Sequence, residues 1–164
     1  MTAGLSAVTD SELTELVETR RIEQLIASYG LFYDSSDFGR FAALFTPDAS
    51  YDITPDPDLF PLPVTGRDAI VESMAGRRHL TASTLGASPR HLSTNVLVHD
   101  LDGDQARVAS FLVVCFAHPD GSYEVRRSGT YVDTVRKTAG IWQFASRHLH
   151  LMAVPRLWPD GDAA

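Results

Sequence analysis

The sequence predicts an α+β fold in which helices come first and a curved, mostly antiparallel sheet follows. Apolar residues recur at helical spacing from about residue 11 to about residue 34. The second half contains four strand-like stretches separated by short turns with glycine, at residues 91–101, 105–118, 123–137 and 141–154. Tight turns join antiparallel strands, whereas a parallel sheet needs helices between its strands, so the order of elements favours the antiparallel arrangement.

The first helix begins after Thr9 or Asp10, either of which can cap it, and the polar DSSD segment at residues 34–37 ends it. Asp37 can cap a second, short helix, FGRFAALF, which ends before Pro47.

The next predicted elements are a short strand and a third helix. The strand covers residues 49–54 and the helix covers about residues 67–79. Residues 81–89, TASTLGASP, are expected to form a loop. Four prolines lie in residues 55–63, which predicts a restricted loop that acts as a lid or as part of an interface.

We expect residues 1–10 to be a flexible tail, residues 11–154 to be one domain, and residues 155–164 to be a C-terminal tail. The predicted strands are longer than usual, so the sheet should bend or bulge. A bent sheet closed by a long helix encloses a cone, which is a ligand cavity wherever side chains do not fill it.

The composition of the chain argues against several classes of partner and of metal site. The net charge of −7 argues against nucleic acid or an anionic membrane as the main partner. The single cysteine, Cys115, excludes an intrachain disulfide and a thiolate metal site. No apolar run reaches the length of a signal peptide core or a bilayer span, and we expect a cytoplasmic protein.

Asp34 is an unusual residue for the C-terminal end of a helix, because the helix dipole disfavours a negative charge there. It either ends the helix and points to water, or it is a buried carboxylate that orients a histidine.

His91 begins the strand RHLSTNVLVH. In a strand it shares a face with Ser93 and Asn95, while Leu92 and Val96 lie on the other face. The polar face is either exposed to solvent or lines a polar patch of a cavity, and periodicity does not choose between them.

Arg147 alternates with apolar residues in the last strand. It is either a buried cation that pairs with an acid or holds a substrate oxygen, or a side chain that reaches the sheet edge. His148 and His150 share the opposite face, but no third ligand follows at a readable spacing, so we expect no metal site.

From about residue 12 to about residue 152 the sequence resembles the SnoaL-like branch of the nuclear transport factor two-like superfamily. The resemblance rests on the segments LFTPDASYDI, TGRDAI, His91-x3-Asn95 and GTYVDTVRKTAGIWQF. The pattern is closest to scytalone dehydratase, the bile acid 7α-dehydratases and hexachlorocyclohexane dehydrochlorinase. This implies a cone-shaped α+β barrel, with a long N-terminal helix and two shorter helices around the sheet.

The resemblance also implies an Asp–His dyad made by Asp34 and His91, with Tyr29 and Arg147 as further catalytic residues. Ionised Asp34 would fix the His91 tautomer, and His91 would remove a proton from a carbon acid. Tyr29 or Tyr33 would stabilise the enolate, and Arg147 would do the same or balance the charge of Asp34. The predicted substrate contacts are Tyr33, Asn95, Tyr51 and Phe45.

The expected function is a cofactor-independent, dehydratase-type lyase acting on a hydrophobic cyclic molecule such as a polyketide, steroid or terpenoid. Where scytalone dehydratase has a second pocket histidine, the strand at residues 105–118 offers only Ser110 or Cys115 near its middle and His118 at its end, so we expect a different substrate. The alternatives are an isomerase or cyclase using the same base, or a non-catalytic binding or subunit-type domain. Family members form dimers or trimers, and we expect a homodimer or homotrimer.

Overall fold

The computed structural model describes residues 7–55, 61–152, 154, 155 and 157. Three helices and six strands follow one another in the order α1 (Asp10–Asp34), α2 (Phe38–Ala43), β1 (Phe45–Thr54), β2 (Val64–Thr65), α3 (Arg67–Leu85), β3 (Ser88–Asp102), β4 (Gln105–Ala117), β5 (Tyr123–Thr138) and β6 (Ile141–His150).

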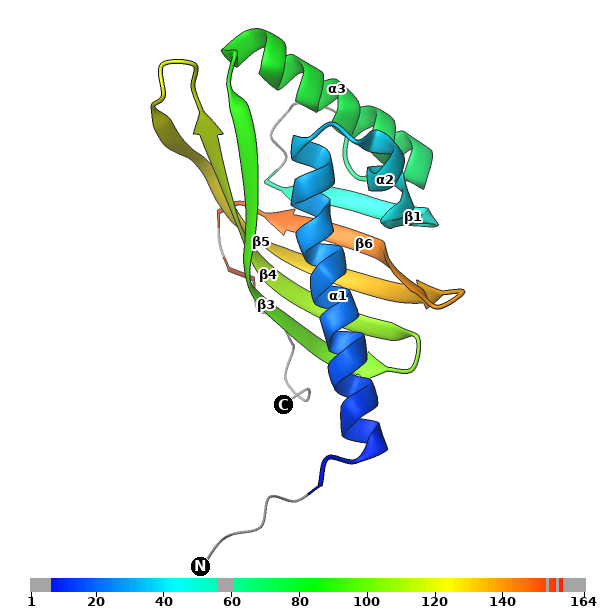
Figure 1. The fold of residues 1–164 in the computed structure, drawn as a ribbon. Coiled ribbons are helices and arrows are strands. Elements are labelled where there is room, and N and C mark those ends of the chain that lie inside the picture. The colour runs from blue at the N-terminus through cyan, green and yellow to red at the C-terminus, as the bar shows by residue number, and fades with distance from the viewer. Residues whose placement is uncertain (1–6, 56–60, 153, 156, 158–164) are drawn as a thin grey trace, which may run out of the picture.

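The strands form one sheet with the order β2-β1-β6-β5-β4-β3. Every neighbouring pair is antiparallel except β1 and β6, which are parallel. Figure 1 shows α1 crossing one face of the curved sheet, with α2 and α3 beyond its C-terminal end. The predicted α+β class is confirmed, as is the predicted cone made by a curved, mostly antiparallel sheet and three helices.

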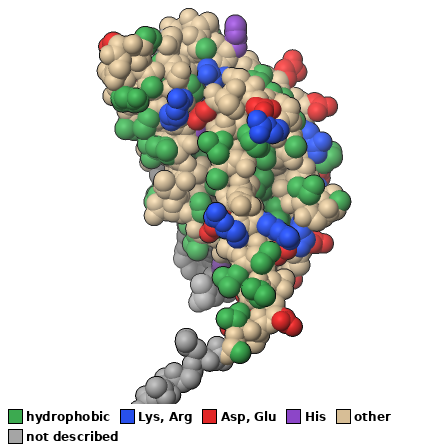
Figure 2. Space-filling view, in the orientation of Figure 1, with side chains coloured by type: hydrophobic (Ala, Val, Ile, Leu, Met, Phe, Trp, Pro, Cys, Tyr) green, Lys and Arg blue, Asp and Glu red, His purple; other side chains and the backbone are tan. Residues whose placement is uncertain are grey.

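Helix α1 begins at a capping box, in which Thr9 and Glu12 each bond the other's backbone N–H. Its C-terminal half is buried against the sheet through Ile22, Ile26 and Tyr29. Its first turns extend past the sheet, and Figure 2 shows hydrophobic side chains exposed at this end, where Leu13, Leu16 and Val17 lie.

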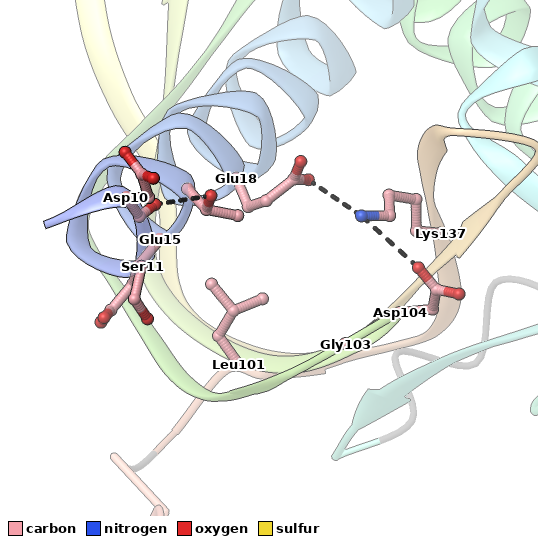
Figure 3. A pocket seen from close by; sticks show the side chains of 9 residues that line it. Asp10, Ser11, Glu15, Glu18, Leu101, Gly103, Asp104 and Lys137 are labelled. Carbon is pink, nitrogen blue, oxygen red and sulfur yellow. Dashed lines mark hydrogen bonds and ion pairs between the residues drawn. The ribbon is translucent and has the colours of Figure 1, made fainter.

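Glu18 connects the N-terminal half of α1 to the sheet. The indole Nε1 of Trp142 donates to its carboxylate at 2.6 Å. Nζ of Lys137 lies 3.4 Å from Oε2 of Glu18 and 3.4 Å from Oδ1 of Asp104. Figure 3 shows these two ion pairs in the hollow between α1 and the β3–β4 turn. The Trp142 hydrogen bond is the main cause of a lowered pKa of Glu18.

Three predicted boundaries were wrong by four residues or more. Strand β1 starts at Phe45 rather than residue 49, because Phe45 pairs with Phe144 of β6. Helix α3 continues to Leu85, since nothing in TASTL breaks it before Gly86, which takes a left-handed conformation (φ 59°). Strand β6 ends at His150 rather than residue 154.

The long strands bulge, as predicted from their length. Strands β3 and β4 lose register between Thr94 and Leu97, and β4 and β5 between Val114 and Cys115. These irregularities curve the sheet around its helical side. None of the described helices combines the length and apolar character needed to cross a membrane.

Of the proline-rich segment, residues 56–60 lie outside the described residues, as does most of the predicted C-terminal tail.

Candidate active site

Helix α1 and strand β3 meet at Gly30 and His91. A Cβ at Gly30 would lie 2.6 Å from the carbonyl oxygen of His91 and 3.2 Å from its Cβ. Glycine is therefore required here by close approach of the two backbones. This contact brings the last turn of the helix, with Asp34, to the start of β3.

Asp34 and His91 form the predicted pair. Oδ1 of Asp34 lies 2.6 Å from Nδ1 of His91, and Oδ2 accepts the backbone N–H of His91 at 2.8 Å. The two side chains are 12% and 14% exposed. Both carboxylate oxygens are thus engaged by one residue, which offsets the unfavourable helix dipole and fixes the imidazole orientation.

His91 also lines a cavity of about 670 Å³ between α1, α3 and the sheet. Because Nδ1 faces Asp34, Nε2 is the ring nitrogen left for a ligand. The apolar lining includes Met74, Leu112, Val114, Phe116 and Leu149. The cone is therefore not filled by its own side chains, and it has the size of a small-molecule site.

Tyrosines form part of the cavity wall. Tyr29, Tyr33 and Tyr51 line it as expected, and Tyr131 joins them. The Tyr33 ring lies edge-on to His91, with centroids 4.9 Å apart. Burial raises the pKa of Tyr33 to about 12, and it raises the pKa values of Tyr29 and Tyr51 as well. These phenols are neutral hydrogen-bond donors at pH 7.

Arg147 is not among the residues that line the cavity, which gives no support to the expectation that it holds a substrate oxygen or balances the charge of Asp34. It matches the other expectation, that of a buried cation paired with an acid. Its buried guanidinium lies 4.0 Å from the Tyr29 ring centroid and 3.6 Å from that of Tyr131. It pairs instead with buried Asp133, at 3.6 Å. The aromatic rings separate it from the cavity, which makes it a support for the tyrosines.

Asp133 is the other half of that buried pair. Burial raises its pKa to about 7, although the positive charge of Arg147 opposes the rise.

Two predicted substrate contacts are also misplaced. Phe45 is fully buried and packs against Tyr29, Phe41 and Phe144, behind the cavity wall. Asn95 is exposed at the β3 bulge, where its φ of 52° breaks the alternation that predicted a shared face with His91. Neither is among the lining residues.

Several lining residues were not predicted from the sequence. Helix α3 contributes Glu72, Ser73 and Arg77, and β5 contributes Arg126 and Arg127. The helix was predicted to end before its last lining residues, Thr81 and Thr84. Alternation along β5 could have indicated Tyr131, which shares a face with Asp133.

Within the described ranges, no group of three or more His, Cys, Asp or Glu residues is placed to hold a metal ion.

A curved α+β cone with an acid–histidine pair beside an unfilled cavity has the architecture of the nuclear transport factor two-like class. The chain belongs to the SnoaL-like domain family, whose model matches residues 14–148. A search of curated proteins finds no match.

Solved structures share the fold. Rv3472 of Mycobacterium tuberculosis, a protein of unknown function, is 29% identical, covering 91% of this chain and 79% of its own, with a TM-score of 0.74. An NTF2-like protein with a cystatin-like fold from Novosphingobium aromaticivorans is 25% identical, covering 93% and 95%, with a TM-score of 0.75. A protein from the same organism titled "Putative Scytalone Dehydratase" is 26% identical, covering 92% and 98%, with a TM-score of 0.67.

Proposed function

We propose that this protein is a cofactor-independent lyase that removes water from a hydrophobic cyclic small molecule. The observation that carries the proposal is the Asp34–His91 pair on the wall of an unfilled cavity. A carboxylate that holds one imidazole nitrogen makes the other a better base, and an apolar cavity shields the reaction from water.

The elimination begins at a carbon next to a carbonyl group. Nε2 of His91 takes the proton, and the electron pair of the broken C–H bond moves into the carbonyl to form an enolate. The enolate then re-forms the carbonyl and expels the hydroxyl group from the adjacent carbon, leaving a C=C bond. The imidazolium returns its proton to the leaving hydroxyl, so one water is released and His91 is neutral again.

Tyr33 is best placed to stabilise the enolate, because its ring contacts His91. Tyr29 and Tyr51 extend the row of neutral donors along the cavity wall. A phenol that stays protonated donates a hydrogen bond to the developing negative charge without moving its own proton. Asp34 and His91 are therefore proposed as catalytic residues, with Tyr29, Tyr33 and Tyr51 as oxyanion or substrate contacts.

The likeness to the protein titled "Putative Scytalone Dehydratase" supports the same class of reaction. A polyketide, steroid or terpenoid ring would suit the apolar lining. From the sequence we expect the protein to form a homodimer or homotrimer and to be located in the cytoplasm.

Two other functions would use the same cavity. An isomerase or cyclase would employ the same base without losing a hydroxyl group, and product mass distinguishes it from a dehydratase. A non-catalytic binding domain would need no aligned dyad. The paired Asp34 and His91 therefore favour an enzyme.

The test is turnover of a panel of cyclic β-hydroxy-carbonyl compounds in D₂O, followed by mass spectrometry. The expected product has lost one water. Asp34→Asn and His91→Ala should each reduce the rate by about 10²–10⁴-fold. Asp37→Asn is the matched control, because Asp37 caps α2 and pairs with Arg40 at the surface. Near-normal turnover in either dyad variant would reject the assignment.

A further inference from the structure

Positive charge gathers on the cavity wall. Three arginines line it, Arg77 from α3 and Arg126 and Arg127 from β5, and Glu72 is the one carboxylate among the described lining residues. This is unusual for a site in a chain with a net charge of −7. An apolar substrate alone would give no reason for it.

A bulge explains how two consecutive residues of one strand both reach the cavity. Val114 of β4 pairs with Arg127, but the next residue, Cys115, pairs with Val125, so Arg126 is the extra residue. In a regular strand, neighbours point to opposite faces, whereas a bulge re-aims a side chain.

The strand register places Arg127 near the dyad. Val114 pairs with His91 on one side and with Arg127 on the other. The three residues thus form a row across β3, β4 and β5, and all three line the cavity. Two strand spacings separate His91 and Arg127, which puts their Cα atoms roughly 10 Å apart.

The surroundings of Arg127 favour an anion. Its side chain is half-buried, and burial lowers its pKa. The positive charges of Arg77 and Arg126 lower the pKa further, and the effects of Tyr51 and Tyr131 oppose them only in part. Nη1 of Arg126 lies 4.0 Å from Oε1 of Glu124, in a pair whose two side chains are both exposed. A bound anion would relieve this repulsion and the cost of burial together.

We propose that Arg127, with Arg77 and Arg126, binds a carboxylate-class anionic group of the ligand, whose apolar body then lies over Leu112 and Val114 toward His91. The proposal deepens the proposed function, because it names the substrate as a hydrophobic acid rather than a neutral ring. A guanidinium fork that holds a carboxylate bidentately would also fix the distance from that group to the carbon that His91 deprotonates.

The test uses two fluorescent probes that differ by one group. 8-Anilinonaphthalene-1-sulfonate carries an anionic group, and N-phenyl-1-naphthylamine has the same rings without it. We expect the wild-type protein to bind the anionic probe at least tenfold more tightly. Arg127→Gln should weaken the anionic probe by about 10-fold or more, the effect of losing a charge-assisted hydrogen bond, and change the neutral probe less than threefold.

Matched variants isolate the site. Arg136→Gln removes an arginine of the same strand that pairs with Asp48 at the surface, and it should change neither probe. Arg127→Lys should keep part of the anion preference. 1-Naphthoate should displace the anionic probe, whereas 1-naphthalenemethanol should not, which assigns the binding to the carboxylate group.

Equal affinity for the two probes in the wild type, or an unchanged preference in folded Arg127→Gln, would overturn the anion site. Because no turnover is involved, that result would leave the proposed elimination standing. Conversely, His91→Ala should keep the anion preference, so a failure of the dyad assignment would not affect this measurement.

Discussion

Gly30 and His91 touch through their backbones: a Cβ at residue 30 would lie 2.6 Å from the His91 carbonyl oxygen. The contact lies one turn before Asp34, whose carboxylate bonds both the ring and the backbone N–H of His91. The dyad therefore depends on how closely α1 lies against β3.

Gly30→Ala should separate these elements. The overpacking costs about 1–3 kcal/mol, which outweighs the gain of up to about 1 kcal/mol from the higher helix propensity of alanine. Denaturant unfolding measures the change. Gly76→Ala is the control, because Gly76 lies within α3 and, apart from its chain neighbours and the backbone of its own helix, no atom lies within 4 Å of an added Cβ; it should stabilise the protein. Equal stability of the two variants would contradict the close contact.

Arg147→Met should destabilise the protein by about 3–5 kcal/mol, because it leaves Asp133 buried without its counter-charge. Arg136→Met, at an exposed pair, should cost about 1 kcal/mol or less. A loss of activity without a loss of stability in Arg147→Met would mean that Arg147 acts on substrate after all.

That loss should also depend on pH. Burial raises the pKa of Asp133 to about 7 in the folded state. The Asp133 carboxyl group therefore binds a proton more tightly in the folded state than in the unfolded state. The contribution of Asp133 to the free energy of unfolding falls as pH rises from about 4 to about 7. Removing Arg147 raises the Asp133 pKa further, so we expect Arg147→Met to lose more stability at pH 8 than at pH 5. Unfolding at both pH values checks this, and an equal loss at both would contradict it.

Ionisation of Tyr33 should lower the stability of the folded protein at alkaline pH. Its pKa is raised by burial to about 12 in the folded protein, against an ordinary value near 10. Stability is therefore lost as pH rises from about 10 through about 12, by roughly 2–3 kcal/mol. Tyr33→Phe should reduce this slope, whereas Tyr123→Phe, at a ring that is 76% exposed, should leave it unchanged. A slope that is the same in both variants would show that Tyr33 is not protected from ionisation.

The order of elements and the dyad could be predicted from the sequence, because helical spacing, turn residues and the family pattern all carry local signals. Asp34 and His91 are 57 residues apart, and the resemblance supplied their pairing. The sequence left several alternatives open for Arg147, and the choice between them depends on which rings stack on its guanidinium across the sheet.

At two β-bulges, side chains do not alternate between the two faces of the sheet as they do in a regular strand. A bulge turned Asn95 out to solvent, and another brought Arg126 into the cavity beside Arg127. Alternation assumes one residue per register position, and the sequence gives no clear signal of where a curved sheet inserts the extra one. The cavity residues Thr81 and Thr84 of α3 were missed for a different reason. The polar TASTL segment is typical of a loop, but the helix continues through it and ends only at Gly86.

The central claim is that Asp34 holds His91 as a base directed at the cavity, and its most direct test is the tautomer of His91. Long-range ¹H–¹⁵N NMR of the neutral imidazole, recorded at alkaline pH, distinguishes a protonated Nδ1 from a protonated Nε2. The account predicts Nδ1–H donating to Asp34, with Nε2 unprotonated, and a shift toward Nε2–H in Asp34→Asn. A wild-type His91 protonated at Nε2, with the same tautomer in Asp34→Asn, would contradict it.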